Sequence, residues 1–153
     1  MRKVLLDTSM VIRALDPGTT DAAELVLAAR QKLAKLLGDA DVVLMVSPLI
    51  YFEATRNIKH EDSERLRRLD AALSGLGLVE VSQPEAELAA HLTRFAVTQG
   101  VKLDKQKFDV LHFACAQLNG LEIEADDGDY NKIATVFNEL KKQNPENAKT
   151  HRH

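Results

Sequence analysis

Hydrophobic residues along the chain form short continuous runs that alternate with longer stretches of helical spacing. The runs cover residues 4–6, 42–46, 78–81 and 121–125, and each is typical of a buried strand. Helical spacing covers about residues 10–15, 21–37, 63–73, 84–99, 107–118 and 130–141. Because parallel neighbours need long crossover connections, this alternation predicts an α/β sandwich with a mainly parallel sheet of roughly four to five strands.

Capping signals mark several helix ends. Ser47 followed by Pro48 is typical of an N-cap and first helical position, which places Glu53 on the second turn of a helix. Ser82 with Glu85 three residues later predicts a capping box. The expected helix ends are marked by Gly38, Gly100 and Gly120.

Length and composition indicate an ordinary globular protein. The chain has 153 residues, 45% hydrophobic and 28% charged, which predicts one domain over 1–141 and a polar C-terminal tail over 142–153. The net charge of -3 argues against a uniformly basic surface that coats nucleic acid. No apolar stretch approaches the ~20 residues needed to cross a bilayer, so a cytoplasmic location is expected. The single Cys115 is interpreted as a buried hydrophobe rather than a catalytic thiol.

Acidic residues follow strands or begin helices at four places. Asp7 ends the first apolar run, Glu53 and Asp109 lie near helix starts, and a cluster of Asp126, Asp127 and Asp129 follows the last run. Parallel strands bring their carboxyl ends to one edge of a sheet, where open α/β folds bind ligands. Carboxylates gathered there repel one another unless a cation neutralises them, so the pattern predicts a site for Mg²⁺ or Mn²⁺.

The segments VLLDTSMVI, SPLIYFEATR, KFDVLHFACAQ and EADDGDY together resemble the signature of PIN domains. These are metal-dependent nucleases, many of them VapC-type toxins of toxin–antitoxin pairs. The resemblance implies a PIN-like three-layer α/β/α sandwich and catalytic roles for Asp7, Glu53, Asp109 and Asp127. Of these, Asp7, Asp109 and Asp127 are the implied metal ligands, and Glu53 orients the attacking water or binds a second ion.

The last motif departs from the family pattern. The family usually carries Thr or Ser followed by a basic residue where this chain has Ala125 and Asp126. Losing the hydroxyl and adding negative charge favours metal binding over phosphate binding. Which of Asp126, Asp127 and Asp129 faces the site stays open, with Asp129 a fifth candidate ligand.

Several polar residues near the acids are candidates for substrate binding. Thr8 and Ser9 can hydrogen-bond a carboxylate or a phosphate, and Arg13, Arg56 and Lys107 can hold RNA phosphates. A solvated surface is the alternative for these basic residues. His112, three residues after Asp109, either shares the site's helical face or is a buried histidine bonded to the backbone. The arginines at 65, 67 and 68 are interpreted as pairing with neighbouring acids on a helix surface.

The expected function is Mg²⁺-dependent endoribonuclease activity, as the toxin of a toxin–antitoxin pair. Resemblance implies an RNA substrate, a small antitoxin that blocks the acidic cleft, and a homodimer formed through apolar positions on the helices of residues 47–73. One alternative is a catalytically degenerate PIN-like module that binds RNA or protein. An aspartyl-phosphate phosphatase is disfavoured because Ser9 stands where that chemistry needs a second aspartate. Singly, each acid can also be a helix cap without catalytic role.

Overall fold

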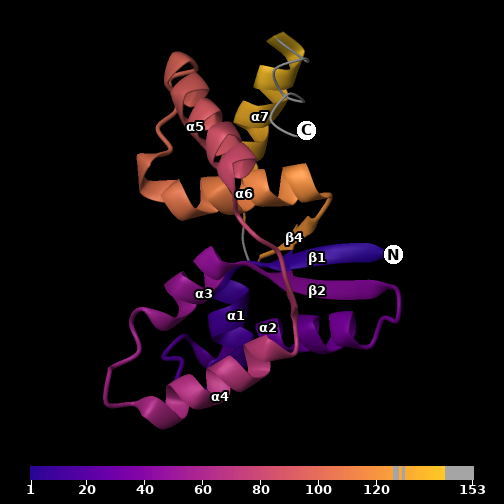
Figure 1. The fold of residues 1–153 in the computed structure, drawn as a ribbon, viewed down its shortest axis with the longest axis vertical. Coiled ribbons are helices and arrows are strands. Elements are labelled where there is room, and N and C mark those ends of the chain that lie inside the picture. The colour runs from indigo at the N-terminus through magenta and orange to yellow at the C-terminus, as the bar shows by residue number, and fades with distance from the viewer. Residues whose placement is uncertain (126–127, 129, 144–153) are drawn as a thin grey trace. The chain divides into compact units, whose positions relative to one another are not determined.

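The computed structural model describes residues 1–125, 128 and 130–143. The elements in order are β1 (Arg2–Leu6), α1 (Thr8–Leu15), α2 (Ala23–Leu37), β2 (Val42–Val46), α3 (Pro48–Thr55), α4 (Ser63–Ser74), β3 (Gly77–Leu78), α5 (Gln83–Thr98), the 3₁₀ turn η1 (Asp104–Gln106), α6 (Lys107–Asn119), β4 (Glu122–Glu124) and α7 (Asn131–Gln143) (Figure 1). Of the residues described, 1–80 and 122–125 form one compact unit, and the others form a second.

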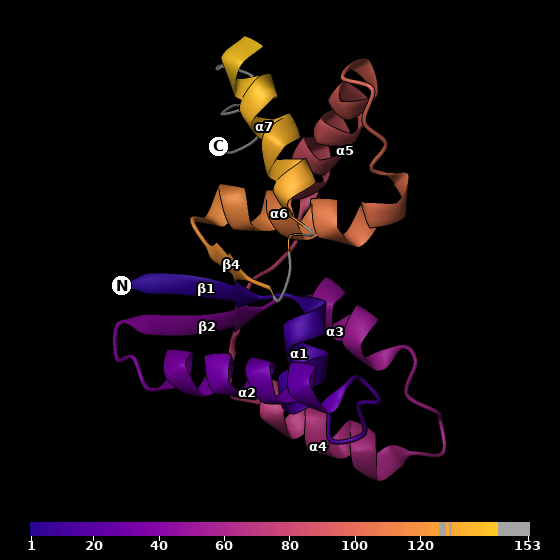
Figure 2. The ribbon, with the colours of Figure 1, turned by 180° about the vertical axis from the view of Figure 1, so that it is seen from behind.

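The first unit is built on a parallel sheet with strand order β3-β2-β1-β4. Val4 pairs with Leu44 on one side and with Glu122 on the other, so β1 is central. Residues Val4 to Leu6 are buried, as the continuous apolar run predicted. Helices α1 to α4 all lie on the same side of this sheet (Figures 1 and 2).

Several expected boundaries in this unit are wrong. Strand β4 covers Glu122–Glu124 instead of residues 121–125, and α2 begins at Ala23 instead of residue 21. The third strand covers Gly77–Leu78 instead of residues 78–81, and its last ladder contact is the Val79 amide donating to the Val46 carbonyl at 2.9 Å. A side chain at Gly77 would meet the flexible end of the Met45 side chain and lie 3.3 Å from the Leu44 carbonyl oxygen, so the glycine leaves room for the neighbouring strand. The first helix begins at Thr8 instead of Met10, because Asp7 caps it.

A buried ion pair joins α1 to α4. The Arg65 guanidinium donates from Nε and Nη2 to the two carboxylate oxygens of Asp16, at 2.8 and 2.7 Å. The Gly18 amide donates to the same carboxylate at 2.8 Å. Local sequence predicted surface pairing for Arg65, which is wrong, whereas Arg67 does pair with Glu64 on the exposed helix face.

The second unit contains α5, η1, α6 and α7. The predicted capping box is present: the Glu85 carboxylate accepts from the Ser82 amide and hydroxyl, and Asn119 of α6 donates to it at 3.0 Å. Burial by itself raises the pKa of Glu85, but these hydrogen bonds lower it below its ordinary value. Phe113 of α6 and Phe137 of α7 pack edge to face, with ring centroids 5.4 Å apart.

Helix α7 includes Lys142 and Gln143, which are the first two residues of the expected tail. The rest of that tail lies outside the described residues. Within the part of the chain that the structure describes, no helix is both long and apolar enough to span a membrane.

Candidate functional site

Asp7 lies at the carboxyl end of the central strand and at the start of α1. Its Oδ1 accepts hydrogen bonds from the Met10 amide at 3.0 Å and from the Ser9 hydroxyl at 2.9 Å. Asp7 therefore is the N-cap of α1, and its side chain is held in one orientation. The residue is only 4% exposed. An exposed aspartate would cap the helix equally well, so capping alone does not explain why this carboxylate is buried, which is unfavourable for a charged group.

Glu53 reaches the same region from α3. This helix begins directly after β2, where the Ser47 hydroxyl accepts from the Ile50 amide at 3.2 Å and Pro48 occupies the first helical position. The half-buried Glu53 accepts at Oε1 a hydrogen bond from the Thr8 hydroxyl at 2.7 Å. Thr8 directly follows Asp7, so this contact brings the first two predicted acids together at the carboxyl-end edge of the sheet.

Asp109 belongs to the second unit, in the first turn of α6. Its Oδ1 accepts from the Tyr130 hydroxyl at 3.5 Å, which is a long hydrogen bond. His112 lies on the same helix and is 1% exposed, which supports its interpretation as a buried histidine. Lys107 is the exposed first residue of α6.

The remaining predicted acids, Asp126, Asp127 and Asp129, lie outside the described residues. Among residues 1–125, 128 and 130–143, no group of three or more His, Cys, Asp or Glu side chains is placed to hold a metal ion. A single centre formed by Asp7, Glu53, Asp109 and Asp127 therefore stays a prediction. The donor chemistry fits a hard divalent cation, because Asp7 and Glu53 supply buried or half-buried carboxylate oxygens.

The two predicted phosphate-binding arginines of the first unit are engaged with neighbours. The Arg13 Nε donates to Asp21 at 3.0 Å. The Arg56 guanidinium lies 5.9 Å from the ring centroid of Phe52, in a cation–π contact. Their role toward RNA stays a prediction, as does that of Thr8 and Ser9, whose hydroxyls instead hold the acids in this structure.

A polar cavity of about 190 Å³ adjoins Glu53 in the first unit. Its walls come from α1, the 16–22 loop, α3 and the turn after it, and α4; they include Ile12, Asp16, Thr19, Thr20, Asp21, Glu53, Asn57, Ile58 and Arg65. Sequence reasoning missed this cavity. The only local signals were the Asp16-Pro17-Gly18 turn and the polar run after it, and neither shows what lies opposite.

Comparison with known proteins supports the resemblance of the four acidic segments to PIN domains. The family model described as "PIN domain" matches residues 4–136. No curated protein matches the chain significantly.

Two solved structures share the fold. The crystal structure of VapBC2 from Rickettsia felis, bound to a DNA fragment from their promoter, has a TM-score of 0.65 at 14% identity and covers 85% of this chain and 91% of that one. FitAcB from Neisseria gonorrhoeae has a TM-score of 0.60 at 20% identity, covering 87% and 92%. These likenesses confirm the predicted PIN-like α/β/α fold class. With the family model matching most of its length, this chain belongs to the PIN domain family.

Proposed function

We propose that this chain is a Mg²⁺- or Mn²⁺-dependent endoribonuclease, the toxin component of a toxin–antitoxin pair. The observation that carries the proposal is the hydrogen bond of 2.7 Å from the Thr8 hydroxyl to Glu53, which holds Glu53 beside the residue that follows Asp7, in a member of a nuclease family. Both acids lie at the edge of a parallel sheet where α/β proteins bind ligands.

Hydrolysis of a phosphodiester needs an activated water, a counter-charge on the phosphate oxygens and stabilisation of the leaving alkoxide. A carboxylate-held divalent cation supplies these when it is bound. In the proposal Asp7 and Asp109 are the principal ligands, Asp127 is a ligand directly or through water, and Glu53 orients the attacking water. The products expected from the family are a 5′-phosphate and a 3′-hydroxyl.

The residues beside the acids position them. Ser9 and the Met10 amide both donate to one oxygen of Asp7, and Thr8 donates to Glu53. A carboxylate whose rotamer is fixed before the cation arrives loses less conformational entropy on binding it. We therefore assign Thr8 and Ser9 as positioning residues for the acidic pair.

Metal-dependent cleavage of RNA tests the proposal. Single-stranded and loop RNA should be cut in Mg²⁺ or Mn²⁺ and left intact after chelation, because the acidic edge repels phosphate until a cation is bound. The variants Asp7→Asn and Glu53→Gln should lose most cleavage, whereas Asp104→Asn, an exposed acid on η1, should keep it. If Asp7→Asn cut RNA at the parental rate under matched metal concentrations, the nuclease mechanism would be wrong. The degenerate binding module would then replace it.

The Thr8 contact has its own test. Thr8→Val keeps the shape of the side chain but removes the donor to Glu53, whereas Thr8→Ser keeps the donor. Cleavage should fall by about tenfold in Thr8→Val and recover in Thr8→Ser, in line with the modest cost of a single hydrogen bond. Equal rates in the two variants would show that Thr8 does not position Glu53.

A protein partner is the second part of the proposal. The structure of similar fold that carries the name VapBC2 supports a two-component assembly. We propose a small antitoxin that covers the acidic edge and blocks cleavage. Co-expression with the product of a short neighbouring reading frame should yield a stable complex without nuclease activity. A neighbouring product that binds and leaves cleavage unchanged would contradict the inhibitory role.

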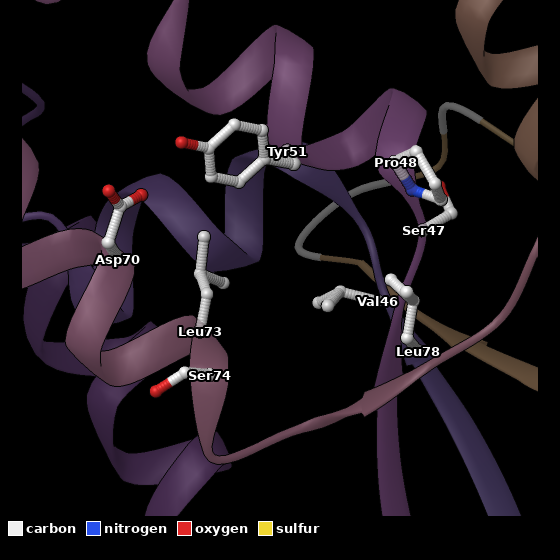
Figure 3. Close-up of a pocket in the computed structure, with 8 residues that line it drawn as sticks. All are labelled: Val46, Ser47, Pro48, Tyr51, Asp70, Leu73, Ser74 and Leu78. Atoms are coloured by element: carbon white, nitrogen blue, oxygen red, sulfur yellow. The ribbon is translucent and has the colours of Figure 1, made fainter.

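An apolar groove in the first unit supports the expected homodimer. It has a volume of about 470 Å³ and lies between α3, α4 and the β2–β3 edge, lined by Val46, Ser47, Pro48, Tyr51, Asp70, Leu73, Ser74 and Leu78 (Figure 3). Tyr51 and Leu78 are exposed beside it, as is the adjacent Phe52. The Tyr51 hydroxyl points toward Asp70, and hydrogen bonding to that carboxylate raises the pKa of Tyr51. Apolar side chains exposed together favour burial against a second copy of the chain.

Sedimentation of the isolated protein tests this dimer. Leu78→Glu should shift the protein toward monomer, because it places a charge in the proposed interface. Val97→Glu is the matched control, since Val97 is 68% exposed and Leu78 64%, and Val97 belongs to α5. A parent protein that sediments only as a monomer would exclude the homodimer. Identical behaviour of the two variants would exclude this groove as its interface.

A further inference from the structure

Apart from Glu53, the residues that line the polar cavity have no role in the proposed metal chemistry. We propose that this cavity binds the base of an RNA nucleotide next to the scissile phosphodiester, and that it favours bases with an exocyclic amino group over uracil. The inference rests on the proposed nuclease function, because it places the base relative to Glu53. It adds a specificity site formed by the 16–22 loop and the turn after α3.

The cavity is preformed by contacts that fix its walls. Asp16 accepts both guanidinium hydrogen bonds from Arg65, and the Gly18 amide donates to the same carboxylate. The loop is then closed by the Thr19 amide donating to the Asp16 carbonyl at 3.3 Å, and by Arg13 donating to Asp21 at 3.0 Å. A loop held in this way presents its side chains to a ligand without a large ordering cost.

Two polar side chains of the cavity are available to a ligand. Within the residues that the structure describes, neither the Thr20 hydroxyl nor the Asn57 side-chain amide forms an intramolecular hydrogen bond, and both residues are exposed. An asparagine amide has donors and an acceptor side by side, which matches the edge of a base that carries an amino group next to a ring nitrogen. Unpaired bases of single-stranded RNA are read along such edges.

The charges of the cavity set the preference among bases. Three carboxylates line it, those of Asp16, Asp21 and Glu53, against the single guanidinium of Arg65. Asp16 accepts from Nε and Nη2 of that guanidinium, and the three carboxylates leave the wall with a net negative charge and several acceptor oxygens. Acceptors favour the amino groups of adenine, cytosine and guanine and repel the two carbonyl oxygens of uracil.

Size and apolar surface agree with a single base. The volume of about 190 Å³ lies below the ~300–1,000 Å³ of pockets that enclose drug-sized ligands, so the cavity has room for a ring but not a whole nucleotide. Ile12 and Ile58 are half-buried in its lining and offer apolar contact to the ring faces. Glu53 belongs both to this cavity and to the acidic pair, so a base bound in the cavity would lie next to the residue proposed to orient the attacking water.

Binding of free nucleosides tests the cavity independently of cleavage. Adenosine and cytidine, titrated into the ¹⁵N-labelled full chain, should shift the side-chain amide resonance of Asn57, and uridine should need about tenfold higher concentration. Asn57→Ala and Thr20→Val should each weaken adenosine binding by about tenfold, because each removes one polar contact to the base. Asn138→Ala, an exposed asparagine on α7, should leave it unchanged. Equal response to all three nucleosides, or none at Asn57, would overturn the inference.

Cleavage of a randomised RNA by the parent and by Asn57→Ala separates this inference from the proposed function. A parental preference at one position beside the cut that disappears in Asn57→Ala supports the base site. Cleavage with the same base preference in both proteins refutes the base site and leaves the nuclease intact. Absence of cleavage, with selective nucleoside binding still present, refutes the nuclease while the cavity keeps its assignment as a base-binding site.

Discussion

Replacing Arg65 by Met tests how strongly the buried ion pair holds the first unit together. Asp16 is 1% exposed and the Arg65 side chain 26%, and two hydrogen bonds of 2.8 and 2.7 Å join them. Arg65→Met preserves the aliphatic length but leaves the buried Asp16 carboxylate, among the described residues, with the Gly18 amide as its remaining donor. Breaking a buried pair costs ~3–5 kcal/mol, and the remaining amide and the partial exposure of Arg65 reduce this to about 2 to 3 kcal/mol.

The loss should depend on pH. Burial alone raises the pKa of Asp16, but the hydrogen bonds from Arg65 and Gly18 bring it below its ordinary 3.8. In the parent, the pair's contribution is therefore complete above pH 3.8 and is lost as the pH falls through the lower folded value. In Arg65→Met burial dominates and raises the pKa of Asp16 above 3.8, so protonation relieves the unpaired charge. The stability difference between the two proteins should be largest near pH 7 and shrink as the pH approaches 4.

Urea unfolding followed by circular dichroism at pH 7 and pH 4.5 measures this difference. Arg67→Met is the matched control, because Arg67 is on the same helix and pairs with Glu64 in an exposed salt bridge. Little measurable change is expected there, since exposed pairs contribute little. Equal losses for Arg65→Met and Arg67→Met, or a loss for Arg65→Met that grows on acidification, would refute the reasoning.

Three further outcomes follow from local geometry. Gly120 has φ +66°, so Gly120→Ala should cost about 1 kcal/mol of unfolding free energy in the same assay, whereas Gly75→Ala, at φ -81°, should cost nothing comparable. Burial raises the pKa of Cys115 to about 11, so a thiol reagent at pH 8 should label it only as fast as the protein opens, and rapid labelling of the folded protein would contradict its burial. Asp7→Ala removes the helix cap and should lower the free energy of unfolding by about 1 kcal/mol, while Asp7→Asn should keep the cap. Thermal unfolding of the two variants without metal measures this difference.

The sequence alone determined what depends on neighbours a few positions apart. Continuous apolar runs placed β1 and β2, and the serine at position 47 with its following proline placed the start of α3. The capping box at Ser82 and Glu85 was also predicted, because its two hydrogen bonds join residues on one helical turn. The four acidic segments could be recognised as a PIN pattern for the same reason, because each is a short stretch of consecutive residues.

Tertiary structure decided the pairs that are distant in sequence. Thr8 meets Glu53 across 45 positions, and Asp16 meets Arg65 across 49. The order β3-β2-β1-β4, which sets the last strand beside the first, likewise depends on how crossover helices pack and not on any run of residues. Local rules gave Arg65 the nearest acids as partners. In the fold Arg65 instead pairs with Asp16, because the buried carboxylate of Asp16 needs a cationic partner wherever the packing supplies one.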